Sequence, residues 1–105
     1  MEGVGKMKYF TVELSPIHNK YIVLPNHTKL GLTSTKGSYA VLGARLMNLS
    51  YANYLKMCRD VYGAVLIGKN HLYINVLFPT EAAATQLANK LDSQVIAIKH
   101  ALAAK

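Results

Sequence analysis

Apolar and polar residues alternate near the start of the chain in a pattern that predicts two β-strands. In residues 8–14 (KYFTVEL) every second side chain is apolar: Phe10, Val12 and Leu14. A period of two is typical of a half-buried strand, because successive side chains point to opposite faces. A Ser-Pro turn follows, and residues 20–25 (KYIVLP) are predicted to return as a second short strand that Pro25 ends.

Helical spacing of apolar residues appears in two later segments. Residues 50–62 carry one apolar stripe at intervals of three and four: Tyr51, Leu55, Cys58 and Tyr62. Ser50 suits the N-cap of this helix, and Gly63 stands where a left-handed C-terminal residue is favoured. A second helix is predicted over residues 81–91, capped by Thr80, with a similar stripe: Ala84, Leu87, Ala88 and Leu91.

Between these two helices the pattern predicts a β-hairpin. Residues 64–67 (AVLI) are an apolar run expected to form a buried strand, and residues 68–70 (GKN) are a tight turn. The return strand over residues 71–78 (HLYINVLF) has one apolar face: Leu72, Ile74, Val76 and Phe78. Its other face is mixed: His71, Tyr73, Asn75 and Leu77. A last strand is predicted over residues 94–100 (QVIAIKH).

The order of these elements predicts an α+β fold of the ferredoxin-like, split βαβ type (βαββαβ). The prediction treats residues 15–49 as a basic insertion after the first strand, containing a short hairpin, a loop and a short helix over 39–48. A chain of 105 residues suits a single domain, here with an N-terminal tail over residues 1–6 and a C-terminal tail over residues 101–105.

In a ferredoxin-like sheet two helices cover one face and the other face stays open. The open face is predicted to carry Tyr9, Thr11, His71, Tyr73 and Asn75. Tyr9 and Tyr73 are expected to lie near one another, because the first and third strands are neighbours in this plan.

Charge adds a candidate ligand to this picture. The formal net charge is +7, and no acidic residue occurs between Glu13 and Asp60. An acid-free basic segment attracts a polyanion or an acidic protein surface. Only 16% of the residues are charged, which for so small a domain predicts an exposed apolar patch and favours a homo-oligomer.

An open sheet with exposed aromatic side chains is a stacking platform for unpaired bases. Residues 71–78 resemble in part the third-strand consensus of the RNA recognition motif: Tyr73, Val76 and Phe78 match it. Three positions depart from it, namely His71, Ile74 and Asn75. This partial resemblance favours single-stranded nucleic acid as the ligand, assisted by nearby lysines: Lys20, Lys29, Lys36 and Lys69. It does not choose between RNA and DNA.

A protein-binding inhibitor, adaptor or regulator, of the type carried by phages and mobile elements, is the alternative function. Tyrosine-rich surfaces serve protein contacts as readily as they serve base stacking. The sequence leaves these two functions open.

Catalysis, metals and cofactors are not expected. The five acidic residues are scattered without a pair spaced for acid-base chemistry, and the four histidines show no metal-binding spacing. Residues 33–38 (TSTKGS) lack the spacing of a phosphate-binding loop and are interpreted as an ordinary loop. Cys58 is predicted to be a buried, unreactive thiol. With one cysteine, no secretory signal pattern and no membrane-spanning run, a cytoplasmic location is expected.

Overall fold

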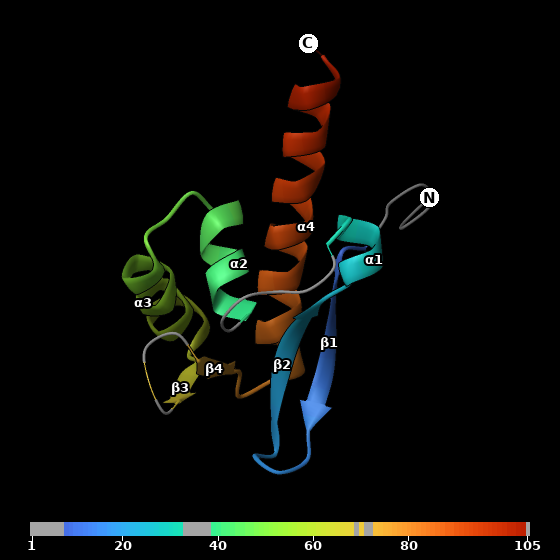
Figure 1. The fold of residues 1–105 in the computed structure, drawn as a ribbon. Coiled ribbons are helices and arrows are strands. Elements are labelled where there is room, and N and C mark those ends of the chain that lie inside the picture. The colour runs from blue at the N-terminus through green and yellow to red at the C-terminus, as the bar shows by residue number, and fades with distance from the viewer. Residues whose placement is uncertain (1–7, 33–38, 69, 71–72, 105) are drawn as a thin grey trace.

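Helices and strands follow one another along the chain in the computed structural model, which describes residues 8–32, 39–68, 70 and 73–104 (Figure 1). The first half contains β1 (Phe10–Ser15), β2 (Lys20–Pro25), α1 (His27–Leu30) and α2 (Tyr39–Leu46). The second half contains α3 (Tyr51–Tyr62), β3 (Val65–Gly68), β4 (Ile74–Leu77) and α4 (Glu81–Ala103). The predicted α+β class is confirmed.

The strands form two separate antiparallel pairs. β1 pairs with β2 in a register that sets Phe10 opposite Pro25, and β3 pairs with β4. One isolated bridge joins the two pairs, because the backbones of Tyr21 and Phe78 exchange hydrogen bonds of 2.9 and 2.8 Å. The predicted ferredoxin-like topology is therefore wrong: β1 is not a neighbour of β4, and each sheet has two strands. The short β1–β2 hairpin, which the prediction set aside as an insertion, supplies the partner of β1.

The predicted strand over residues 94–100 is also wrong, because these residues belong to α4. The helix continues through the expected C-terminal tail as far as Ala103 and ends with Ala104 as its C-cap. Its apolar positions repeat at helical intervals of four, three and four: Leu91, Val95, Ile98 and Leu102. No Gly or Pro interrupts this segment, and alanine favours the helix, so β-branched residues between 95 and 98 do not break it.

The predicted helix caps are confirmed. The Ser50 side chain accepts a hydrogen bond from the Asn53 backbone N–H at 3.1 Å, and Thr80 caps α4 in the same way. Gly63 follows α3 with a φ of 70°, the left-handed conformation that glycine adopts without strain. Within the predicted insertion, Asn26 caps the short helix α1, which the sequence pattern did not predict. The predicted tail over residues 1–6 lies outside the described residues.

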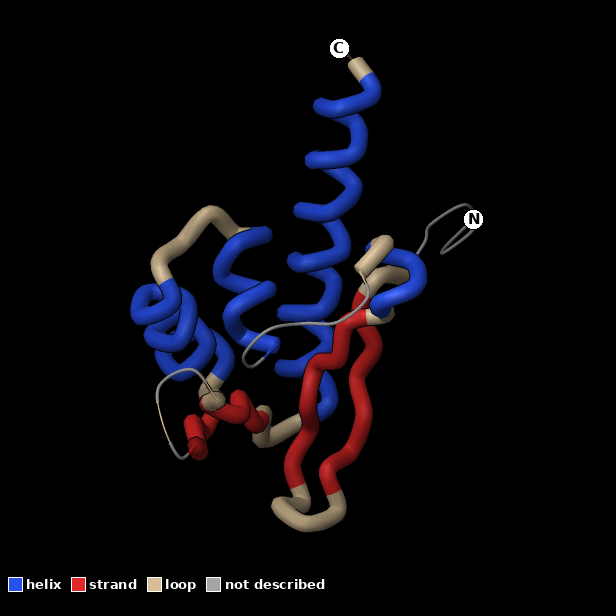
Figure 2. The backbone as a smooth tube through the Cα atoms, viewed as in Figure 1, coloured by secondary structure: helices blue, strands red, loops and turns tan. Residues whose placement is uncertain are grey.

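The core gathers around the N-terminal half of α4. Figure 2 shows α2 and α3 on one side of this helix and the β1–β2 hairpin on the other. Leu87 and Leu91 of α4 are fully buried with Phe78. The Asp92 carboxylate attaches α4 to β1, accepting hydrogen bonds from the backbone N–H groups of Tyr9 at 2.8 Å and Phe10 at 3.0 Å.

Gly43 of α2 and Tyr54 of α3 explain the close packing of these helices. A Cβ at Gly43 would lie 2.3 Å from the Tyr54 hydroxyl oxygen, so glycine is required for the close approach.

Cys58, one turn after Tyr54, has no exposed surface, which confirms the predicted buried thiol. Burial raises the pKa of the Cys58 thiol to about 11 and thereby keeps it protonated at neutral pH.

Candidate functional site

The β3–β4 hairpin exposes one face. Ile67 of β3 lies directly opposite Asn75 of β4, so both side chains stand on this face. Tyr73, two residues before Asn75, is 57% exposed, and Ile67 is 43% exposed. The alternating residues Ile74 and Val76 are half-buried and pack against the core. The predicted division of the return strand into an inner and an outer face is therefore confirmed for residues 73–76, but it is wrong for Leu77, which was predicted on the outer face and is 1% exposed.

A shallow hollow of about 460 Å³ lies on this hairpin and is called the hairpin hollow. Its lining consists of Ile67, Gly68, Asn70, Tyr73 and Asn75. The end of the hairpin is tight, because a Cβ at Gly68 would lie 2.6 Å from the Tyr73 carbonyl oxygen. Glycine at this position allows the return strand to approach this closely, and Gly68 itself lines the hollow.

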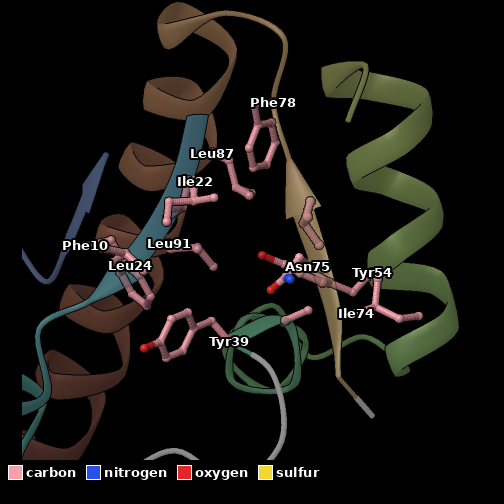
Figure 3. Close-up of a pocket in the computed structure, with 13 residues that line it drawn as sticks. Phe10, Ile22, Leu24, Tyr39, Tyr54, Ile74, Asn75, Phe78, Leu87 and Leu91 are labelled. Atoms are coloured by element: carbon pink, nitrogen blue, oxygen red, sulfur yellow. The ribbon is translucent and has the colours of Figure 1, made fainter. Parts of the chain in front are cut away.

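A second concavity, the central pocket, is a cavity of about 80 Å³ with residues from β2, α2, β4 and α4 in its wall. Its walls are mostly apolar, with Ile22 and Leu24 of β2 facing Asn75 (Figure 3). Figure 3 shows the Asn75 side chain pointing from β4 into the space between β4 and β2. Tyr39, at the start of α2, adds a second polar group to the lining.

Asn75 lines both concavities, so the hairpin hollow and the central pocket share a border. Tyr73 lies in the hollow and Tyr39 lies in the pocket wall, and both tyrosines are exposed. We call the surface formed by Ile67, Tyr73, Asn75 and Tyr39 the Asn75 surface. It combines an exposed tyrosine from each concavity with an amide that borders both, which suits a planar, hydrogen-bonding ligand.

His27 contacts the Tyr39 end of this surface, and two described lysines stand on α1 and β2. The ring of His27 in α1 makes an edge contact with the Tyr39 ring, at 6.2 Å between centroids. Lys29 is exposed on the same short helix, and Lys20 begins β2 next to the bridge between Tyr21 and Phe78. Within the described part of the chain, Lys20 and Lys29 form no ion pair.

Two of the described acidic residues are engaged by groups other than Lys20 and Lys29. Asp60 is occupied by Lys56 and Arg59 on α3, whose hydrogen bonds hold the pKa of its carboxyl below the usual range. Asp92 accepts from the β1 backbone. The other two described acidic residues, Glu13 and Glu81, are exposed, so the described part of the chain has eight Lys or Arg residues against four Asp or Glu residues and keeps a net positive charge.

The predicted position of Tyr9 is wrong. Tyr9 is 4% exposed and lies in the core cluster, so it is not on an open sheet face beside Tyr73. The Lys99 ammonium lies 5.7 Å from the centroid of its ring. The prediction assumed that β1 has a helix on one side and solvent on the other. In the structure, Tyr9 directly precedes β1, and its backbone N–H donates a hydrogen bond to the Asp92 carboxylate of α4.

The other predicted site residues fall into four groups. Tyr73 and Asn75 belong to the Asn75 surface. Thr11 is exposed on β1, directly opposite Leu24, which lines the central pocket. The positions of Lys20 and Lys29 are given above, and three predicted residues lie outside the described residues: Lys36, Lys69 and His71.

Sequence reasoning missed Tyr39 and His27. The only signal for Tyr39 in the sequence was an aromatic residue at the start of a predicted helix, directly after a loop with hydroxyls and a lysine. Its neighbour His27 is twelve residues earlier, and only the tertiary structure brings the two rings together.

Comparisons with models of known protein families, with curated proteins and with solved structures found no match. Among the residues that the structure describes, no cluster of three or more His, Cys, Asp or Glu side chains is arranged to hold a metal ion. In the same residues, no helix combines the length and the apolar character needed to cross a membrane.

Proposed function

We propose that this chain is a non-catalytic protein that binds single-stranded nucleic acid across the Asn75 surface. One observation carries the proposal: Asn75 borders two concavities, and each of them has an exposed tyrosine, Tyr73 or Tyr39, in its lining. Two aromatic rings separated by an amide suit successive unpaired bases, which stack on the rings while the amide donates and accepts hydrogen bonds at a base edge.

The charge distribution supports the same ligand. The phosphates of a bound strand need cations near the stacking residues, and Lys29 is exposed on α1, the short helix whose His27 ring contacts Tyr39. The net charge of +7 favours association with any polyanion, and its effect decreases with added salt. Stacking supplies the part of the free energy that salt does not screen, about 1–3 kcal/mol per base.

The test is fluorescence anisotropy with labelled oligo(dT) and oligo(rU) of about 12 nucleotides, a length within the range of single-strand sites. Binding is measured at about 50 and about 200 mM salt, because phosphate contacts weaken steeply over that interval. Tyr73→Ala and Tyr39→Ala are each expected to raise the dissociation constant about tenfold, as the loss of one stacked base predicts. Comparing the two oligonucleotides shows whether RNA or DNA is preferred.

Matched controls separate the site from a general loss of charge or surface. Ile17→Ala removes an exposed apolar side chain in the β1–β2 turn and leaves affinity unchanged. Lys29→Gln is compared with Lys90→Gln, which removes the same charge from the exposed side of α4. Equal losses for both lysine variants, with no effect of either tyrosine variant, would reduce the interaction to nonspecific charge attraction and end the proposal.

A further inference from the structure

The C-terminal half of α4 projects beyond the rest of the protein (Figure 1). The helix has 23 residues and is therefore about 34 Å long. Its apolar stripe is buried where the core covers it, with Leu91 and Val95 only 2% and 4% exposed. On the projecting part the same stripe is uncovered, since Ile98 is 42% and Leu102 is 64% exposed.

These four residues belong to one helix face. They follow one another at intervals of four, three and four residues, which keeps them in a narrow stripe. The lower part of this face packs between the β1–β2 hairpin and α2, where the Gln94 side-chain amide donates to the Leu46 carbonyl oxygen at 3.1 Å. The exposed part is thus a direct continuation of a packing surface, and no described element covers it.

The surroundings of the exposed stripe are basic. Lys99 and His100 lie on the projecting part of α4, and the Lys99 ammonium stands over the ring of Tyr9, next to Lys8. Arg45 precedes Leu46, whose carbonyl oxygen is held by α4. No acidic residue occurs in α1, in α2 or in residues 93–104, so the described residues around the exposed stripe offer these groups no carboxylate other than that of the buried Asp92.

Charge decides between the candidate occupants. A second copy that packed its own projecting half of α4 on this face would bring Lys99 near its equivalent, and residues 93–104 of neither copy contain an acid to compensate. Nucleic acid would satisfy the cations and leave Ile98 and Leu102 in contact with water or phosphate. A helix with an apolar face and acidic flanks matches both features at once.

We propose that the projecting half of α4 binds an acidic amphipathic helix of another protein. Ile98 and Leu102, one turn apart, pack against apolar side chains of the partner, and Lys99, Arg45 and Lys8 pair with carboxylates on its flanks. This site is separate from the Asn75 surface and does not depend on the proposed nucleic-acid function.

The test uses a labelled synthetic peptide of about four helical turns, the length of a typical helix. It has leucines along one face and glutamates on both flanks, and binding is followed by anisotropy with the full chain. Two matched peptides replace either all glutamates by glutamine or the leucines by serine. Binding of the parent peptide that weakens at least tenfold in both matched peptides is the expected result.

The corresponding protein variant is Ile98→Gln with Leu102→Gln, since glutamine keeps the helix propensity of an exposed position. The control is Ile17→Gln with Val61→Gln, which removes two exposed apolar side chains elsewhere. Circular dichroism checks that both proteins keep their helix content. The α4 variant is expected to lose peptide binding at least tenfold and to keep its affinity for oligonucleotides, while the control keeps both.

Four outcomes overturn the proposal. The parent peptide fails to bind, or the glutamine peptide binds equally well, which removes the role of charge. Sedimentation of the protein alone shows a dimer that the α4 variant abolishes, which makes a second copy the occupant. Finally, the α4 variant loses oligonucleotide binding in parallel with peptide binding, which assigns this end of the protein to nucleic acid.

Discussion

Replacing Asp92 by alanine tests the contact that joins the two ends of the chain. The carboxylate accepts hydrogen bonds from two backbone N–H groups, of Tyr9 and Phe10, at 2.8 and 3.0 Å, and it is 8% exposed. Alanine leaves both donors without this partner in the core. An unsatisfied buried donor costs about 1–3 kcal/mol, so the two together cost about 3 kcal/mol when some water enters. The higher helix propensity of alanine returns about 0.5 kcal/mol.

Asp92→Asn is the informative comparison, because both hydrogen bonds go to one carboxylate oxygen and an amide oxygen can replace it. For these two hydrogen bonds the substitution removes the contribution of the negative charge, which is about 1 kcal/mol. Asn89→Ala, at an exposed position of the same helix, measures the propensity gain alone. The expected order of unfolding free energies is therefore Asn89→Ala highest, then Asp92→Asn, then Asp92→Ala.

Urea unfolding followed by circular dichroism provides the measurement. With a urea dependence of about 1.5 kcal/mol per molar, Asp92→Ala lowers the midpoint by roughly 2 M and Asp92→Asn by less than about 1 M. If the unfolding free energy of Asp92→Ala lies within about 0.5 kcal/mol of that of the Asn89→Ala control, the reasoning is refuted. The contact between β1 and α4 would then contribute nothing that solvent does not replace.

The remaining predictions concern the contact between α2 and α3. Gly43→Ala improves helix propensity by about 1 kcal/mol but places a Cβ 2.3 Å from the Tyr54 hydroxyl oxygen. Overpacking of this kind costs about 1–3 kcal/mol, so a net loss of thermal stability is expected, and an unchanged or higher melting temperature contradicts it. Cys58 is fully buried and burial raises its pKa to about 11, so iodoacetamide alkylation at pH 8 is expected to be slow in the native protein and fast in urea. Equal alkylation rates in the two conditions would show that the thiol is accessible in the native state.

The sequence alone was sufficient for features that depend on neighbouring residues. The caps at Ser50 and Thr80 and the left-handed Gly63 follow from interactions within a few residues, and the structure confirms them. The opposite orientations of Asn75 and Ile74 follow from the period of a strand, whatever that strand pairs with. The burial of Cys58 follows from the apolar stripe of α3.

The sequence predicted the two hairpins, but only the tertiary structure decided that they remain separate sheets and where α4 ends. Strand pairing is a competition between distant segments, and here the nearby β2 takes β1 as its partner, which removes the predicted four-stranded sheet. The segment 94–100 is short and rich in β-branched side chains, so its local pattern favours a strand. The structure forms a helix there because the helical stripe that contains Leu91 and Val95 is buried against the core. The same packing buries Tyr9, because the Asp92 carboxylate of α4 takes the backbone N–H groups at the start of β1. Contacts between residues more than 80 positions apart leave no signal in a local sequence pattern, and in this protein such a contact determines which tyrosines are exposed.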